Sequence, residues 1–71
     1  MTFKDYLNKR RVTSTPNGDF VVDAKRDPMF PDVQSWSQLE TYLISRAASV
    51  DVVDAAKQVW KGYERALNVA K

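Results

Sequence analysis

The stretch from Ser49 to about Ala70 constrains the fold more than any other part of the sequence. Placed on a helix, its apolar residues fill an arc of roughly 160°, the pattern of a helix that lies on a hydrophobic core. The apolar side consists of Val52, Val53, Ala56, Val59, Trp60, Tyr63, Ala66, Leu67 and Ala70. We therefore predict a long C-terminal helix, capped by Ser49, with Trp60 and Tyr63 in the middle of its buried side.

The N-terminal residues predict a first, shorter helix. Thr2 and Asp5 have the spacing of a capping box, in which each side chain accepts a hydrogen bond from the backbone N–H of the other. The helix is expected from about Phe3 to Arg11, with cations in its last turn, where they suit the helix dipole.

The stretch around Pro16 has two interpretations. Asn17-Gly18 between two short runs fits the tight turn of a β-hairpin. The same residues fit a helix from about Pro16 to Arg26, with Thr15 as N-cap and proline as the first residue. Propensity leaves the two close to even. We favour the helix because a lone two-stranded hairpin is only marginally stable.

A third helix is expected to end near Ala47, and its start is ambiguous by about one turn. Ser35 and Ser37 each begin a capping-box pattern, so the helix starts at Trp36 or at Gln38. A tryptophan at a helix start that is partly exposed can anchor a binding partner. The simpler interpretation of Trp36 is that it packs against the core.

Size and composition restrict the functions open to this chain. Its 71 residues suffice for one small domain, residues 1–71, and leave little room for a walled pocket. The sequence has no histidine, the commonest general base and metal ligand, and no cysteine. It also has no glycine-rich phosphate loop and no nucleophile elbow. We therefore expect no catalytic activity, no metal or other cofactor and no small-molecule substrate.

The sequence also indicates where such a protein works. No apolar run approaches the roughly 20 residues of a membrane span. The first residues lack the charged and then apolar pattern of a signal peptide. A cysteine-free chain suits a reducing compartment. We expect a soluble, cytoplasmic protein that does not bind membranes.

The hydrophobic pattern resembles that of one known family. Its most specific part is the motif Phe20-x3-Ala24-x2-Asp27-x2-Phe30-Pro31. The later pair Trp60-x2-Tyr63 supports it. These residues look like the YozE family, whose domain has a fold similar to a sterile alpha motif, and the resemblance covers about residues 3 to 66. Trp36 stands where the family tends to have tyrosine.

The resemblance implies an all-α fold, a compact four-helix bundle similar to a sterile alpha motif. It favours the helix over the hairpin in the stretch around Pro16. It implies little about function, because the family consists of small bacterial proteins without an assigned activity. Domains similar to a sterile alpha motif bind proteins, some self-associate, and some bind nucleic acid, but a shared fold does not carry function across.

Three sets of charged residues are candidate interaction sites. One lies at the end of the first helix, one recurs every four residues along the second, and one forms a row on the last. In that order they are Lys9, Arg10 and Arg11; Asp19, Asp23 and Asp27; and Lys57, Lys61 and Arg65. For each set the simpler interpretation is a solvated helix surface, and Asp54 and Glu64 interrupt the last one.

Two functional hypotheses follow. The first is a non-enzymatic interaction module that binds another protein or itself, because the acidic set is complementary to the basic ones. The second is weak nucleic-acid binding through the two basic sets, which would fall steeply with salt. The net charge of +2 is mild for a nucleic-acid-binding domain.

Overall fold

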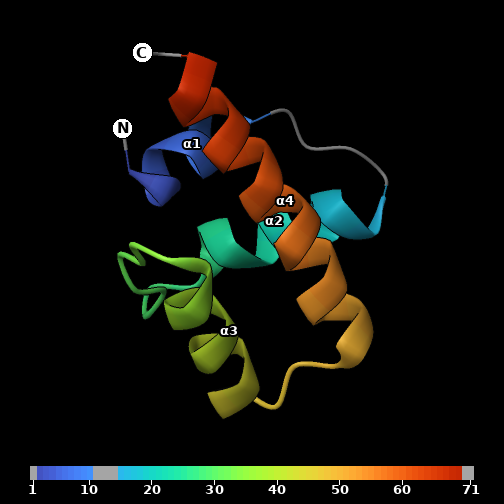
Figure 1. Cartoon of the computed structure of the whole chain (residues 1–71). Coiled ribbons are helices and arrows are strands. Elements are labelled where there is room, and N and C mark those ends of the chain that lie inside the picture. Colours follow the sequence, from blue (N-terminus) through green and yellow to red (C-terminus); the bar gives the residue numbers. More distant parts are fainter. Residues whose placement is uncertain (1, 11–14, 70–71) are drawn as a thin grey trace.

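The computed structural model of the chain describes residues 2–10 and 15–69, except for the side chains of residues 16 and 69. The described residues form four α-helices and no strand: α1 (Phe3–Lys9), α2 (Pro16–Arg26), α3 (Trp36–Ser45) and α4 (Val50–Val69), shown in Figure 1. The predicted all-α fold is therefore confirmed, and so is the helical interpretation of the stretch around Pro16.

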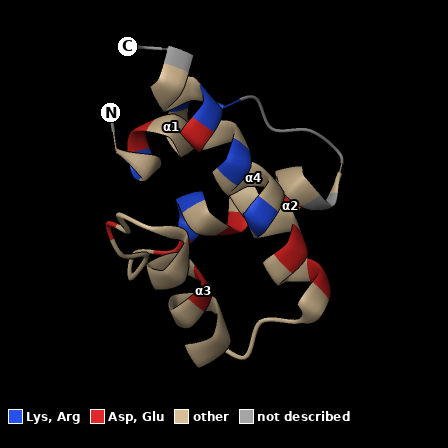
Figure 2. Ribbon diagram, viewed as in Figure 1, with Lys and Arg blue, Asp and Glu red and all other residues tan. Residues whose placement is uncertain are grey.

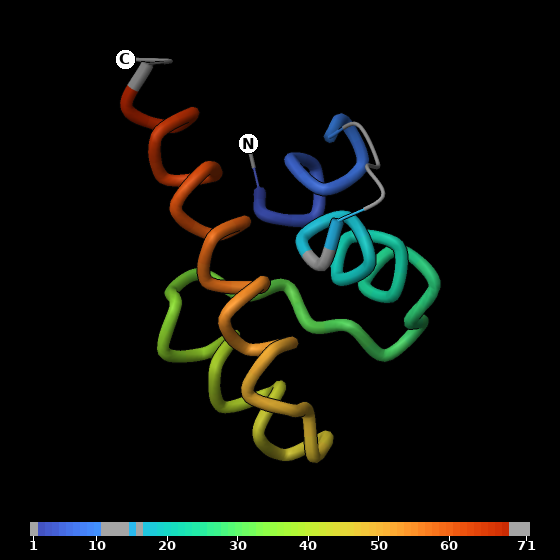
Figure 3. Tube along the Cα trace, turned by 90° about the vertical axis from the view of Figure 1, so that its right-hand side faces the viewer, coloured from blue at the N-terminus to red at the C-terminus, as the bar shows by residue number. Residues whose placement is uncertain are grey.

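Helix α4 runs the length of the molecule, with α1 and α2 on one side of it (Figure 3). The connection between α2 and α3 then crosses the molecule to reach α3. The predicted buried side of α4 is confirmed at its centre, where Val59, Trp60 and Tyr63 are buried. At its N-terminal end the prediction was wrong, because Ala55 is buried while Val52 is 36% exposed.

An aromatic cluster joins α1 to α4. The ring of Phe3, which is completely buried, lies 4.8 Å from the ring of Trp60 and 5.3 Å from that of Tyr63, measured between centroids. The tilted and edge-on arrangements of these rings are the ones that aromatic pairs prefer. A helix as short as α1 is not stable by itself, so this contact is what holds it.

Phe30 connects the remaining helices to the cluster. It lies in the segment between α2 and α3, and its ring is 6.3 Å from Phe3, 6.5 Å from Phe20 and 5.5 Å from Tyr42. One residue outside any helix thus contacts rings from α1, α2 and α3. A short apolar segment between two helices becomes part of the core in this way.

The helix starts follow the sequence signals. The Thr2 hydroxyl accepts a hydrogen bond from the Asp5 N–H (3.1 Å), and the Asp5 carboxylate accepts one from the Thr2 N–H (3.2 Å). These two bonds complete the predicted capping box. The Thr2 N–H that donates to the Asp5 carboxylate, with the Thr2 side chain adding to its effect, lowers the pKa of Asp5. Thr15 caps α2 through the Gly18 N–H, and Ser49 caps α4 through the Val52 N–H.

Helix α3 starts at the earlier of its two predicted positions. The Ser35 hydroxyl accepts a hydrogen bond from the Gln38 N–H (3.2 Å), so Ser35 is the N-cap. The Gln38 side chain accepts a bond from the Gln34 N–H (2.8 Å). Both partners of Gln38 therefore lie before the helix, which fixes its start at Trp36.

Two predicted helix ends were wrong. Helix α1 ends at Lys9, because Arg10 has extended backbone angles (φ −75°, ψ 136°); Arg11 lies outside the described residues. Helix α3 ends at Ser45, because Ala47 adopts a left-handed conformation with φ 57°. Side chains other than glycine adopt this conformation at a cost, and nothing in the local sequence marks it.

A Schellman motif closes α3. The Ala48 N–H donates to the Leu43 carbonyl and the Ala47 N–H to the Ile44 carbonyl, each at 3.0 Å. These bonds satisfy two carbonyls at the end of the helix. Ala48 also packs against the core, as the residue after the left-handed position commonly does. The motif therefore turns the chain sharply from α3 toward α4.

A close approach between α1 and α4 depends on Gly62. A β-carbon at this position would lie 2.6 Å from the Tyr6 hydroxyl oxygen, closer than real contacts allow. That hydroxyl is held in place, because it accepts a hydrogen bond from Arg10 Nη1 (2.8 Å) and its ring packs 5.6 Å from Tyr63. Glycine inside the helix costs about 1 kcal/mol relative to alanine, and the packing of Tyr6 accounts for its presence.

We predict that Gly62→Ala destabilises the protein when residue 6 is tyrosine and stabilises it when residue 6 is phenylalanine. In the wild-type background the new methyl displaces the Tyr6 hydroxyl and lowers the free energy of unfolding by about 1 kcal/mol. In a Tyr6→Phe background the obstructing oxygen is absent. The higher helix propensity of alanine then raises the free energy of unfolding by up to about 1 kcal/mol. Urea unfolding of the four variants measures this coupling. Equal effects of the substitution in both backgrounds would contradict the explanation.

Candidate functional site

Acidic residues near the N-terminus of α4 are followed by basic residues farther along the helix (Figure 2). Asp51 and Asp54 are exposed near its N-terminus. Lys57, Lys61 and Arg65 follow as an exposed row, and none of the three forms an ion pair with another described residue. Asp51 in the first turn of α4 suits the helix dipole, whereas the basic row lies before the last turn of the helix, which contains no basic residue. The basic row predicted from the sequence is thus a solvent-facing surface, with Glu64 beside it.

The basic end of α1 lies close to α4 but is partly used in packing. Arg10 is half-buried; its Nη1 donates to the Tyr6 hydroxyl, and its guanidinium carbon lies 5.9 Å from the centroid of the Tyr6 ring. Gly62 of α4 is beside it. Lys9 is exposed, and Arg11 lies outside the described residues. Arg10 therefore contributes to the fold as well as to the charge of this end.

The acidic series on α2 separates into two parts. Asp19 and Asp23 are exposed and form no ion pair with another described residue. Asp27 is half-buried and is the C-cap of α2. Only the first two thus form a free acidic edge, although the spacing in the sequence is the same for all three.

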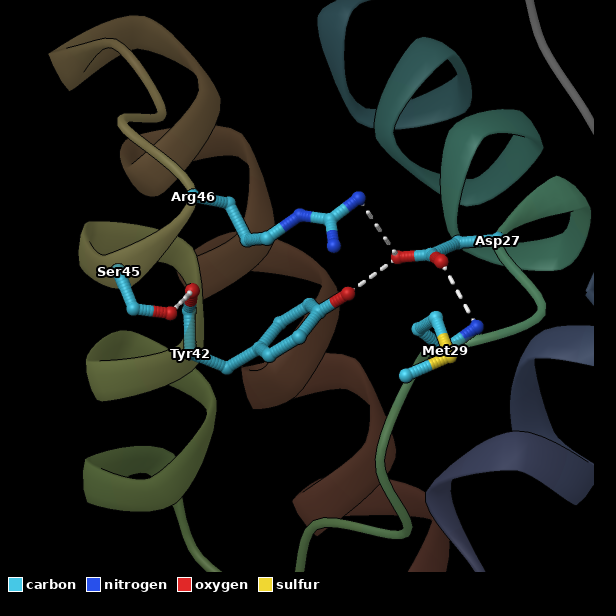
Figure 4. A network of polar contacts seen from close by, with 5 residues as sticks. All are labelled: Asp27, Met29, Tyr42, Ser45 and Arg46. Carbon is cyan, nitrogen blue, oxygen red and sulfur yellow. Dashed lines mark hydrogen bonds and ion pairs between the residues drawn. The ribbon is translucent and has the colours of Figure 1, made fainter.

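Asp27 is the centre of a polar cluster that joins α2 to α3 (Figure 4). Its Oδ2 accepts a hydrogen bond from the Tyr42 hydroxyl, and its Oδ1 accepts one from the Met29 N–H (2.9 Å). Arg46 Nη2 lies 3.9 Å from Oδ2, and the guanidinium carbon is 5.6 Å from the centroid of the Tyr42 ring. The two hydrogen bonds, with Arg46 adding to them, lower the pKa of Asp27, and the bond to this carboxylate raises the pKa of Tyr42.

Sequence reasoning missed Arg46 and the polar role of Tyr42. The two residues are one turn apart on α3, so their shared side was visible in the spacing. Their partner Asp27 is fifteen residues away from Tyr42 in the chain, and only the fold brings it near.

A groove with an apolar floor lies where α2, α3 and α4 meet. One part, of about 100 Å³, includes Leu43 and the Asp27 cluster in its lining, and the other, of about 180 Å³, includes Asp19 and Asp51. Both parts are lined by Phe20, Asp23 and Val52, so they are continuous. The floor is therefore apolar and the edge toward the N-terminus of α4 is acidic.

Large apolar side chains are exposed at the same end of the molecule. Val52 borders the groove, and Val50 precedes it in α4 with 75% of its surface exposed. Ile44, near the end of α3, is 64% exposed. Exposed apolar side chains that lie together with a groove are typical of interaction sites. Trp36, which we considered as an anchor, is half-buried and packs against the core.

The described residues offer no grouping of three or more Asp and Glu side chains that would hold a metal ion. Among the same residues, no helix combines the length and the apolar character that crossing a membrane requires. No buried polar side-chain atom in the described part of the chain lacks a hydrogen-bond partner. The groove, the acidic edge of α2 and the basic row of α4 form the candidate site.

Comparison with known proteins identifies the family. The family model described as "YozE SAM-like fold" matches residues 2–65, and the chain therefore belongs to the YozE family of domains with a fold like the sterile alpha motif. The resemblance noted in the sequence is confirmed. No curated protein and no solved structure matches the chain.

We predict that Asp27 makes stability depend on pH in the acid range. Because the pKa of Asp27 is lower in the folded protein than in the unfolded chain, its stabilising contribution is fully present above the ordinary value of 3.8. That contribution is lost as the pH falls through the folded-state pKa. Asp27→Asn should therefore unfold at lower urea concentration than the wild type near pH 7, and the difference should shrink toward about pH 2.

Asp19→Asn is the matched control for this measurement, because Asp19 is exposed and forms no ion pair with another described residue. Its urea midpoint should stay close to that of the wild type at both pH values. A constant difference between Asp27→Asn and the wild type across the acid range would show that the charge of Asp27 does not contribute.

Proposed function

We propose that this YozE-family domain is a non-enzymatic interaction module that binds another protein or another copy of itself. The observation that carries the proposal is the groove between α2, α3 and α4, with exposed Val52 at its edge and Ile44 and Val50 nearby. Exposed apolar side chains cost solubility unless something covers them for part of the time. The acidic edge adds a means of selecting the partner by charge.

Because Asp27 is part of the fold and Asp19 and Asp23 are exposed, only the last two are replaced in the binding experiment. Replacing all three aspartates would also remove the hydrogen bonds of Asp27 and disturb the end of α2. The double variant Asp19→Ser/Asp23→Ser leaves Asp27 intact and changes only exposed side chains. Its effect on binding is therefore not confused with an effect on folding.

We predict that chemical cross-linking in the cells that make this protein captures a partner, and that the double variant reduces the captured amount by about tenfold. Glu64→Ser, an exposed carboxylate near the other end of α4, is the control and should capture as much as the wild type. Equal capture by all three proteins, or no capture by the wild type, would contradict the proposed function.

A second candidate function is weak nucleic-acid binding through the basic residues. The observation that favours it is the position of Arg10 beside Gly62, which brings the basic end of α1 near the row on α4. Lys57, Lys61 and Arg65 are exposed along two turns of that helix, a spacing that suits contacts with successive phosphates.

For this candidate we predict binding to short duplex DNA at about 50 mM salt that weakens steeply as salt rises. Lys57→Ala/Lys61→Ala should lower the slope of log K against log salt by about 2, since each phosphate contact contributes about 0.9. Lys25→Ala, an exposed cation on α2, should leave the slope unchanged. Absence of a gel shift at about 50 mM salt would exclude nucleic-acid binding.

A further inference from the structure

The partner that fits the groove can be described by its chemistry, on the basis of the interaction function proposed above. We infer that the groove binds a basic amphipathic helix of a different protein, which places an apolar side chain on Phe20 and Val52 and directs Lys or Arg to Asp19 and Asp23. The inference rests on the apolar lining of the groove, on the spacing of its carboxylates, and on the lack of a sheet edge and of an apolar side chain beside the basic row among the described residues.

The floor of the groove determines the apolar part of the partner. Phe20 is buried in the core and lines both parts of the groove, while Val52 lies at the edge with 36% of its surface exposed. The 100 Å³ part continues toward Leu43. This volume is of the order of one leucine or phenylalanine side chain, and it is an apolar setting in which such a side chain gains most from burial.

The edge of the groove determines the charged part. Asp19 and Asp23 are one turn apart on α2, which sets them about 6 Å from each other along the helix. Asp51 of α4 lines the same part of the groove. All three carboxylates are exposed and form no ion pair with another described residue, so they remain available to cations of a partner.

The fold itself favours a helical partner. The described residues contain no strand, so they offer no sheet edge to which an extended peptide can add. A helix that carries cations at i and i+4 repeats the spacing of Asp19 and Asp23. Its apolar side chains at neighbouring positions then face the groove, which is the usual way in which an amphipathic helix binds between two others.

The helices that the structure describes do not supply such a partner helix. The exposed row Lys57, Lys61 and Arg65 has the required charges. The large apolar side chains exposed on the described residues are at positions 29, 44, 50 and 52, and none of them lies within that row. A second copy therefore has cations for the edge of the groove but no apolar side chain beside them for its floor. This mismatch points to a different protein as the partner.

The test uses the full 71-residue chain and a synthetic helical peptide of about four turns. The peptide contains leucines at i, i+4 spacing, with lysines alongside them, and a matched peptide replaces every lysine by glutamate. Calorimetry measures both affinities, and an NMR titration of backbone amides and methyl groups locates the binding. We expect the basic peptide to perturb Asp19–Asp23, Leu43 and Asp51–Ala55, and the acidic peptide to bind at least about tenfold more weakly.

Two variants at exposed positions separate the contributions of charge and apolar contact. Asp23→Lys and Val52→Ser should each weaken binding of the basic peptide by about tenfold or more. Glu64→Lys makes the same change of charge as Asp23→Lys, but on an exposed residue that does not line the groove, and its affinity should stay within about twofold of the wild type. Unchanged far-UV circular dichroism establishes that each variant is folded.

Several outcomes would overturn the inference. They are no binding of the basic peptide, equal binding of the two peptides, perturbations centred on other residues, and Asp23→Lys or Val52→Ser variants that bind as the wild type does. Light scattering that shows a dimer, converted to monomer by Val52→Ser, would identify a second copy as the occupant and would also overturn it. If the peptide fails while cross-linking still captures a partner through Asp19 and Asp23, the proposed function stands and only the partner's chemistry is wrong.

Discussion

The contact between the first helix and the last is the interaction on which the rest of the structure depends. The Phe3 ring packs against both Trp60 and Tyr63, whose own rings are 5.0 Å apart, and each large aromatic side chain buries about 150–250 Å². In a chain of 71 residues the core is small, so these large rings make up a substantial part of it beside the buried aliphatic side chains. Phe30 extends the same cluster to α2 and α3 without belonging to either helix.

Patterns confined to one helix predicted the fold well. The stripe around Trp60, the proline at the start of α2 and the caps at Thr2 and Ser49 all act within a few residues, and all were confirmed. Features that depend on a second element were missed. The extended backbone of Arg10 has no local signal, although the bond between its side chain and Tyr6 spans the four residues that one helical turn brings together.

In the candidate site, too, the sequence predicted what lies on one helix and missed what depends on contacts between helices. Its charged residues were found from their spacing, and their functions stay predictions. The spacing could not separate Asp27, which Tyr42 and Met29 hold as part of the fold, from Asp19 and Asp23, which are exposed and form no ion pair within the described part of the chain. The groove was not predicted at all, because it forms where three helices meet and no single helix contains it. The sequence placed Val52 in the core, and its exposed position at the edge of the groove is the observation on which the proposed binding surface depends.

The Schellman motif at the end of α3 has a consequence for any molecule that enters the groove. Its backbone hydrogen bonds and the left-handed Ala47 fix the corner between Leu43, which lines the groove from α3, and Val52, which lines it from α4. For the partner proposed above, the two walls joined by this short, hydrogen-bonded corner form a preorganised receptor. Such a receptor loses little conformational entropy on association, so more of the contact energy is retained as affinity.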